Sequence, residues 1–199
     1  MELGSSVGIP LIVISRSDDH ATTINSILRD SGPPVHCLRA NDLATLGDQL
    51  KSAPPDMVLF FDGEADADFA AAVAAVALCT PPPPLLLVQG RVDEPGIAAA
   101  MDKGARDVVS LAHRDRLRAV VGRELHAHRL RLALEGVLSS ARQYKQELRS
   151  LMTGASEAIA DVHEGIIVAV NHAWAALLGV ASEEELIGQP YMELIHETK

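Results

Sequence analysis

Few residues in this 199-residue chain have the types and spacing that metal binding or catalysis requires. Cys37 and Cys79 lie far apart in apolar surroundings, which favours buried free thiols over a disulfide. The histidines lack the spacing to cysteines or acidic residues that a metal site needs. One carboxylate, that of Asp62, directly follows an apolar run. The sequence therefore predicts neither a metal site nor a catalytic site.

Short apolar runs alternate with helix-like segments through the first half of the chain. An apolar run rich in β-branched residues is typical of a strand buried on both faces of a parallel sheet. Residues 11–14 form such a run, and the stretches at 35–38, 57–61, 85–88 and 107–110 are interpreted as the other four strands. The segments between them contain helical spacing or alanine-rich stretches, such as that at 66–78, and end at glycine or proline. Five strands alternating with helices predict an α/β fold with right-handed crossovers.

This layout resembles the receiver domain of bacterial response regulators over roughly residues 8–125. The strongest local matches are Pro-Asp-Met-Val-Leu at 55–59 and Lys-Gly-Ala-Arg-Asp at 103–107, which lead into the third and fifth strands. The resemblance implies a flavodoxin-like, doubly wound parallel sheet with strand order 2-1-3-4-5 in a domain at 1–125. In such sheets the working site lies beyond the carboxyl ends of the strands.

The residues at those strand ends depart from the receiver pattern. A working receiver holds Mg²⁺ with an acidic pair, phosphorylates an aspartate and binds the phosphoryl group with a hydroxyl residue and a lysine. The aligned positions hold Ser15 and Arg16 for the pair, Phe61 for the acceptor, Gln89 for the hydroxyl and Leu111 for the lysine. A shift of one position makes Asp62 the acceptor, but without an acidic pair to neutralise the phosphate. The resemblance thus implies a degenerate receiver with a vestigial acceptor pocket.

A stretch without proline at 113–152 predicts one long helix that continues from the last receiver helix. Leu117, Val120, Val121 and Leu125 are expected to pack on the receiver. Farther along, apolar residues alternate at spacings of three and four, which favours a left-handed, parallel, dimeric coiled coil. This seam comprises Ala127, Leu130, Leu134, Val137, Ala141, Tyr144, Leu148 and Leu151. The alternative is a single helix that packs back on its own chain.

Charge is unevenly distributed along the chain, whose net charge is −10. Acidic and basic residues number 15 and 7 in residues 1–112, 4 and 9 in 113–152, and 8 and 1 in 153–199. The basic residues of the middle stretch are interpreted as a solvated flank of the long helix. They include Arg114, Arg116, Arg118, Arg129 and Arg131, with His113, His126 and His128.

Composition also argues against nucleic-acid binding, membrane insertion and secretion. The net negative charge argues against nucleic-acid binding. No apolar run reaches the roughly 18 residues that a transmembrane helix needs. Residues 1–8 lack the basic and apolar regions of a signal peptide. We therefore expect a cytoplasmic protein without membrane insertion.

The last part, residues 153–199, resembles the first half of a PAS domain. Two strand-like stretches flank a Glu-Gly turn at 164–165, Asn171 is placed to cap a helix that carries Trp174, and a Leu-Ile-Gly turn follows at 186–188. Trp174 is expected in the core. The resemblance implies a partial α+β domain without the later strands that line a PAS ligand pocket. We therefore expect a fragment of a longer signalling protein and no cofactor.

The order of these three parts resembles the amino-terminal region of FimX-type cyclic di-GMP signalling proteins. In that family a receiver without phosphorylation residues precedes PAS, GGDEF and EAL domains, and the proteins act in type IV pilus assembly at the cell pole. The resemblance implies a non-catalytic scaffold that forms a homodimer and docks a signalling or pilus-related protein. Two alternatives stay open: a phosphorylation-dependent receiver that uses Asp62, and a PAS-based sensor of small ligands.

Overall fold

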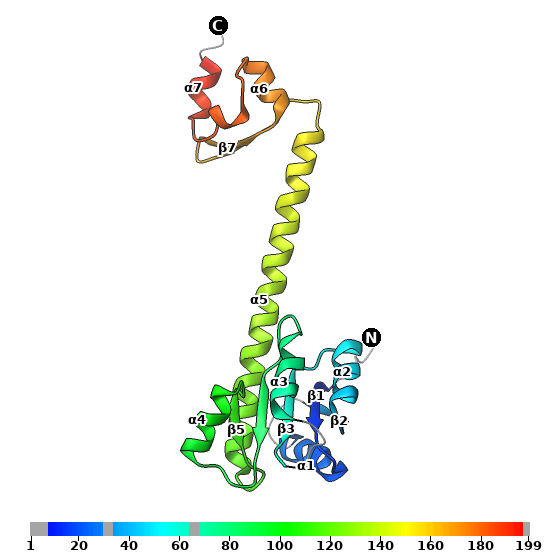
Figure 1. Ribbon diagram of the computed structural model, residues 1–199. Coiled ribbons are helices and arrows are strands. Elements are labelled where there is room, and N and C mark those ends of the chain that lie inside the picture. Colours follow the sequence, from blue (N-terminus) through cyan, green and yellow to red (C-terminus); the bar gives the residue numbers. More distant parts are fainter. Residues whose placement is uncertain (1–7, 30–33, 64–67, 197–199) are drawn as a thin grey trace, which may run out of the picture. The chain divides into compact units, whose positions relative to one another are not determined.

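The computed structural model describes residues 8–29, 34–63 and 68–196 (Figure 1). The chain divides into two compact units, Met1–Leu134 and Glu135–Lys199. The division falls inside the 41-residue helix α5 (Arg114–Gly154). Each unit is described separately below.

A five-stranded parallel sheet forms the centre of the first unit. Its strands are β1 (Ile9–Ile14), β2 (Val35–Ala40), β3 (Met57–Phe61), β4 (Leu85–Val88) and β5 (Asp107–Val109). They lie in the order β2-β1-β3-β4-β5. The predicted flavodoxin-like order is confirmed. Since successive side chains of a strand point to opposite faces, the wholly apolar runs supply two cores, one on each face of the sheet.

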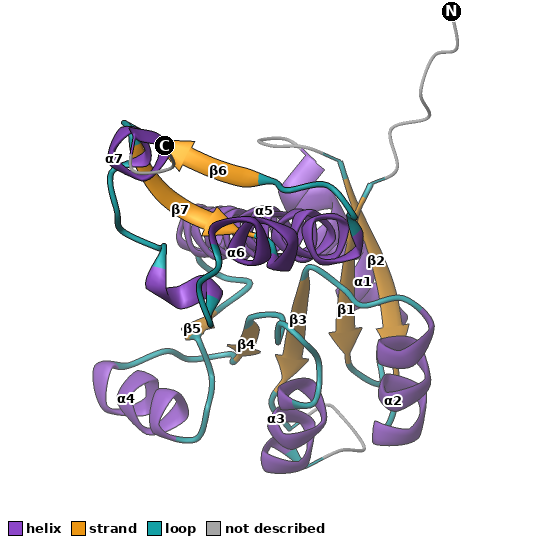
Figure 2. Cartoon of the chain, turned by 90° about the horizontal axis from the view of Figure 1, so that it is seen from above, coloured by secondary structure: helices purple, strands orange, loops and turns teal. Residues whose placement is uncertain are grey.

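Helices cover both faces of this sheet (Figure 2). They are α1 (Asp18–Arg29), α2 (Leu43–Ser52), α3 (Phe69–Ala77), α4 (Glu94–Asp102) and the first part of α5. The buried residues of α1 and α5 pack on one face, and those of α2, α3 and α4 pack on the other. The side chains of Asp42, Asp68 and Asp93 cap α2, α3 and α4 by accepting backbone N–H bonds. The start predicted at residue 66 for the third helix lies outside the described residues.

The first part of α5 belongs to the core of the first unit. Leu117, Val120, Val121 and Leu125 are buried in the cluster that also contains the α1 side chains, as the sequence predicted. On the sheet side, Leu59 of β3 belongs to the same cluster and is fully buried. This stripe fixes which face of α5 points toward the sheet and which faces point away from it.

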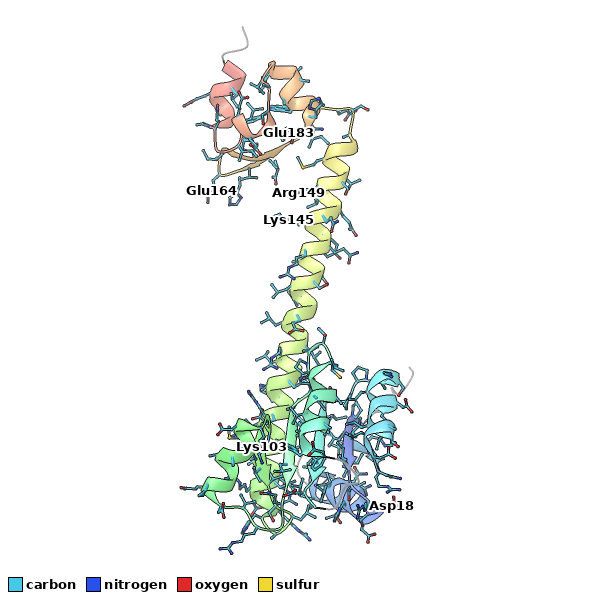
Figure 3. The ribbon with its side chains drawn as sticks, in the orientation of Figure 1. Asp18, Lys103, Lys145, Arg149, Glu164 and Glu183 are labelled. Atoms are coloured by element: carbon cyan, nitrogen blue, oxygen red, sulfur yellow. The ribbon has the colours of Figure 1, made fainter. Side chains whose placement is uncertain are left out.

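The second unit contains a small antiparallel hairpin and short helices. Strands β6 (Ala160–His163) and β7 (Ile166–Val170) are joined by Glu164 and Gly165, which both have positive φ (Figure 3). Positive φ at both central residues is typical of a type I′ hairpin turn. Helix α6 (His172–Leu178), the 3₁₀ turn η1 (Glu183–Glu185) and α7 (Tyr191–His196) follow. The core of this unit comprises Ile167, Val170, Ala175 and Leu186.

Over the described ranges, none of the helices combines the length and apolar character that crossing a bilayer would require.

Candidate functional site

The position at the end of β3 that was predicted to correspond to the receiver acceptor holds an aromatic side chain. Phe61 is the last residue of β3, is 4% exposed, and belongs to the core on the α1 and α5 side of the sheet. Its ring lies nearly parallel to the imidazole of His20, with the ring centroids 4.0 Å apart. A phosphoryl group has no oxygen acceptor at this position, because the side chain is a hydrocarbon.

The residues after β1 form a closed polar arrangement. Ser15 is fully buried, and its Oγ lies 2.7 Å from Nδ1 of His20 and accepts the backbone N–H of Ser17 at 3.1 Å. Arg16 is exposed, and its carbonyl oxygen accepts a hydrogen bond from Arg39 at 3.0 Å. His20 therefore joins Ser15 to Phe61 through one hydrogen bond and one ring contact. Sequence reasoning missed His20, which carries no motif of its own.

Asp62 lies just beyond β3 and is exposed. Its Oδ2 accepts a hydrogen bond of 2.8 Å from Nε2 of Gln89, and its backbone N–H donates to Val88. The structure thus brings together two of the residues singled out in the sequence. Leu111 is half-buried and packs against the core that contains Phe61. A hollow of about 220 Å³ lies between these residues, Ser110 and Ala112.

These residues do not fit a receiver magnesium site. Mg²⁺ prefers hard oxygen ligands from several carboxylates and waters. Ser15 is bonded to His20, Phe61 is apolar, and the nearby Asp18 forms an ion pair with Arg39. In the described part of the chain, no three acidic, histidine or cysteine side chains are grouped so that they could hold a metal ion. Asp62 is left as one carboxylate bonded to an amide.

Several basic residues in the first part of α5 are bonded to carboxylates of the first unit, so their interpretation as a solvated flank is wrong in part. Arg116 and Arg123 each donate to the carboxylate of Asp107 at 2.9 Å. Arg129 makes two hydrogen bonds to Asp56, at 2.8 and 3.0 Å. His128 is 4% exposed. The physical reason is that half-buried and buried carboxylates on the sheet need cationic partners, and α5 supplies them.

A buried acidic side chain on α5 completes this network. Glu124 is 6% exposed and accepts hydrogen bonds from Nε of Arg106 at 2.9 Å and from Nε of Arg123 at 2.8 Å. The hydrogen bonds that Arg123 donates to Glu124 and to Asp107 raise the pKa of Arg123 above its ordinary value. The only sequence signal for this network was the presence of an acidic residue within a basic helix.

The predicted seam residues lie on an exposed face of α5. Ala127 and Leu130 are exposed, whereas Leu125 and His128 on the neighbouring face are buried. Leu130, Leu134, Val137, Tyr144, Leu148 and Leu151 are each between 57% and 71% exposed. Ala141 is exposed as well. Leu138, which lies beside the seam, is 46% exposed. Most of the apolar side chains of the predicted seam are thus largely exposed to solvent.

The side chain of Asn171 makes four hydrogen bonds to backbone groups of the second unit. It is 1% exposed, and its Oδ1 accepts the backbone N–H groups of Ile159 and Trp174 at 2.9 and 3.1 Å. Its Nδ2 donates to the carbonyls of Met152 and Glu157 at 3.1 and 2.7 Å. The predicted N-cap is confirmed, and the same side chain also bonds the end of α5.

The two thiols are poorly suited to nucleophilic chemistry. Burial raises the pKa of Cys37 to about 12 and raises that of Cys79. Both cysteines are free. Because the thiolate is the reactive form, neither thiol is activated for catalysis at neutral pH.

Comparison with known proteins relates the two units to known folds. Residues 146–199 match the family model described as the PAS fold. No curated protein sequence matches the chain significantly. A signal receiver domain from Vibrio parahaemolyticus, described as that of a Luxo repressor protein, has a TM-score of 0.55 and 14% identity, and the match covers 65% of this chain and 98% of that one.

Two further solved structures show the same likeness. The response regulator domain of Thermotoga maritima CheB has a TM-score of 0.50 and 15% identity, over 60% of this chain and 97% of that one. A protein from Burkholderia pseudomallei, described as related to pilus assembly, has a TM-score of 0.50 and 19% identity, over 63% of this chain and 96% of that one. At these identities the likeness shows the fold. The first unit has a receiver fold, and a segment that matches the PAS fold follows it.

Proposed function

We propose that this chain is a non-catalytic signalling scaffold. Its receiver fold acts as a pseudo-receiver that works without phosphorylation, and α5 pairs with α5 of a second copy. The pair sets the geometry of the PAS-like segment and of any domains beyond it. The observation that carries the proposal is the exposed apolar seam of α5, placed between a receiver fold and a segment that matches the PAS fold.

The second copy is the occupant that the seam pattern favours. A repeat of 3.5 residues keeps an apolar face against a helix of the same repeat, which is the requirement of a two-stranded coiled coil. In a parallel pair, Leu138 lies beside Ala133 of the second copy, so the apolar surface widens next to Leu134 and Val137. An antiparallel pairing removes this contact.

The seam is suited to a reversible dimer. Ala127 and Ala141 are small residues at core positions, and Gly136 lowers helix propensity by about 1 kcal/mol relative to alanine. A weak seam has two accessible states, paired and separated, or two registers. Such a two-state element is what a signal passed along a helix requires.

The strand-end geometry supports a phosphorylation-independent mode. Phe61 fills the acceptor position, and Ser15 is hydrogen-bonded to His20 where an acidic pair would hold Mg²⁺. Any signal therefore reaches this unit by binding of a protein or ligand, or by pairing. The receiver surface becomes a docking surface for a signalling partner.

A role in pilus regulation is the finer form of this proposal. The FimX-type order of parts supports it, and the Burkholderia pseudomallei protein described as related to pilus assembly shares the receiver fold. In this form the chain docks a pilus-related protein in the cytoplasm near the cell pole, and cyclic di-GMP domains follow in the parent protein.

The decisive experiment is the absolute mass of residues 1–199 by light scattering over a concentration series. Leu134→Lys with Leu148→Lys places charges in the seam, and we expect the dimer to dissociate. Ser139→Lys with Gln146→Lys adds the same charges to the outer face of α5, and we expect the dimer to persist. A monomer at all concentrations, or equal effects of the two double variants, would refute the proposal.

A further inference from the structure

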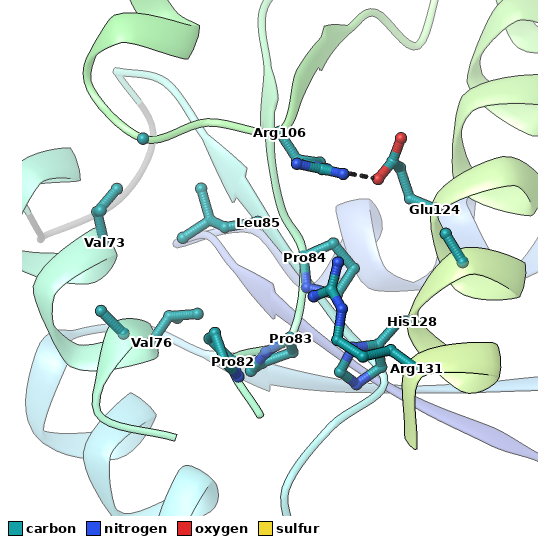
Figure 4. A pocket seen from close by; sticks show the side chains of 13 residues that line it. Val73, Val76, Pro82, Pro83, Pro84, Leu85, Arg106, Glu124, His128 and Arg131 are labelled. Atoms are coloured by element: carbon teal, nitrogen blue, oxygen red, sulfur yellow. Dashed lines mark hydrogen bonds and ion pairs between the residues drawn. The ribbon is translucent and has the colours of Figure 1, made fainter. Parts of the chain in front are cut away.

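A second pocket lies at the amino-terminal ends of β4 and β5, at the opposite end of these strands from the hollow beside Asp62 and Gln89. It has a volume of about 200 Å³ and is formed by the end of α3, the proline loop before β4, Arg106 before β5, and α5 (Figure 4). Its lining comprises Val73, Val76, Ala77, Pro82, Pro83, Pro84, Leu85, Gly104, Arg106, Glu124, Ala127, His128 and Arg131. All of these residues belong to the first unit.

One side of this pocket is apolar. Val73 and Val76 come from α3, and Pro82 and Pro83 come from the loop that precedes β4. Proline rings and valine methyl groups are rigid and have no hydrogen-bonding groups in their side chains. This wall is therefore suited to the hydrocarbon part of a ligand, because burial of apolar surface away from water is favourable.

The other side of the pocket carries an excess of positive charge. Glu124 contributes the one carboxylate of the lining, and it is bonded to two guanidinium groups, those of Arg106 and Arg123. Arg106 uses its Nε–H for this bond, and a guanidinium has four other N–H donors. Arg131 adds a further cation, and no carboxylate in residues 8–29, 34–63 and 68–196 forms an ion pair with it.

The imidazole of His128 completes the polar side. It lines the pocket from α5, is 4% exposed, and lies one helical turn before Arg131 (Figure 4). A neutral imidazole carries one N–H donor, and a protonated imidazole carries two. The polar side thus combines guanidinium and imidazole groups, the usual partners of carboxylate and phosphate oxygens.

We propose that this pocket binds a small organic anion. The hydrocarbon body of the ligand lies against Val73, Val76 and Pro83, and its carboxylate or phosphate group accepts hydrogen bonds from Arg131 and Arg106. Drug-sized ligands occupy pockets of roughly 300–1,000 Å³. A volume of about 200 Å³ corresponds to a smaller molecule, of the size of a single aromatic ring with one anionic group.

The proposal of an anion site does not depend on the proposed pairing of α5, although the pocket and the seam share one residue. Ala127 lines the pocket and is also the first residue of the seam. A bound anion therefore lies beside the start of the seam. Binding is measured separately from dimerisation, so a failure of one proposal leaves the other standing.

The test is binding of probe molecules to residues 1–199. Binding is measured by titration calorimetry and by the shifts of the NMR signals of the Val73 and Val76 methyl groups. The probes are benzoate, phenyl phosphate, inorganic phosphate and the neutral benzamide. We expect benzoate or phenyl phosphate to bind and to shift these methyl signals, and we expect benzamide and inorganic phosphate to bind at least about tenfold more weakly. The stronger of the two organic anions identifies the anionic group.

Three variants test the location of the site. Arg131→Gln is expected to weaken binding about tenfold, because a charge-assisted hydrogen bond is lost. Arg142→Gln removes the same charge from an exposed position of α5 outside the pocket, and it is expected to leave affinity unchanged. Ala77→Phe fills the pocket from an exposed position of α3 and is expected to abolish binding.

Four results would overturn the proposal. The first is no binding of either organic anion at 20 mM, a concentration on the order of the weakest useful affinity. The second and third are an affinity for benzamide, or for inorganic phosphate, equal to that for the organic anions. The fourth is an equal effect of Arg131→Gln and Arg142→Gln on the affinity.

Discussion

At the scale of single residues, aromatic packing fills the end of β3. Phe61 adds a ring to the core where a receiver has an acceptor, and His20 connects that ring to Ser15. The positions of Phe61 and Ser15 were readable from the sequence once strand ends were aligned. The contact through His20 was not, because it joins residues of a helix and two strands by stacking, which leaves no periodic signal.

Asp62 is expected to resist phosphorylation by small phosphodonors. Its carboxylate is bonded to Gln89, and no acidic pair is present to bring Mg²⁺ to a phosphate beside it. Incubation with acetyl phosphate and Mg²⁺ should leave the intact mass of the protein unchanged. The matched variant is Asp62→Asn. Addition of one phosphoryl group to the parent protein, and its loss in Asp62→Asn, would establish the phosphorylation-dependent alternative.

Asn171 is expected to hold the second unit together. Asn171→Ala removes an N-cap and leaves the carbonyls of Met152 and Glu157 without their donor, so we expect a loss of roughly 2–4 kcal/mol. Trp174 is the single tryptophan, and its fluorescence during urea unfolding reports this unit. Asn171→Asp keeps the cap acceptor but loses both donors, and its free energy of unfolding should lie between those of the parent protein and Asn171→Ala. An unchanged midpoint for Asn171→Ala would contradict the assigned role.

At the scale of elements, apolar runs predicted the sheet well. The runs at 57–61 and 85–88 coincide with β3 and β4, because a strand buried on both faces has an apolar residue at every position. The course of α5 was also predictable, since it contains no proline. The ion pairs of α5 were not predictable, because they join residues such as Arg129 and Asp56 that lie 73 positions apart.

Gly136 is expected to limit the stability of the second part of α5. A Cβ added at this position has no atom within 4 Å, so alanine fits and stabilises the helix by about 1 kcal/mol. An exposed helix is marginal in water and becomes ordered on pairing. Gly136→Ala should therefore raise helicity and tighten the dimer by about tenfold, as measured by circular dichroism and light scattering.

Gly104→Ala is the contrasting variant. Gly104 has a φ of +104°, and an added Cβ would lie 2.6 Å from Cγ1 of Val73. Alanine at this position should destabilise the receiver fold, because both the backbone conformation and the space favour glycine.

If Gly136→Ala weakened the dimer, the proposed pairing through an ordered α5 would be wrong.

At the scale of the whole chain, charge and apolar surface make opposite contributions to self-association. Each copy carries a net charge of −10, so two copies repel one another. The seam on α5 is apolar, so low salt does not strengthen the pairing through it. A basic stretch lies between two acidic ones, which offers a different mode, in which α5 of one copy binds the acidic surface of another.

Salt dependence separates these two modes. Raising NaCl from about 0.02 to 0.3 M shortens the screening length from roughly 20 to 6 Å. If the seam holds the dimer, screening reduces the repulsion between the acidic copies, and the dimer dissociation constant should fall several-fold in analytical ultracentrifugation. If α5 instead binds an acidic surface, the constant should rise over the same range. The double variant Leu134→Lys with Leu148→Lys sharpens the distinction, because it abolishes a seam dimer at every salt concentration but strengthens a complex built on charge attraction.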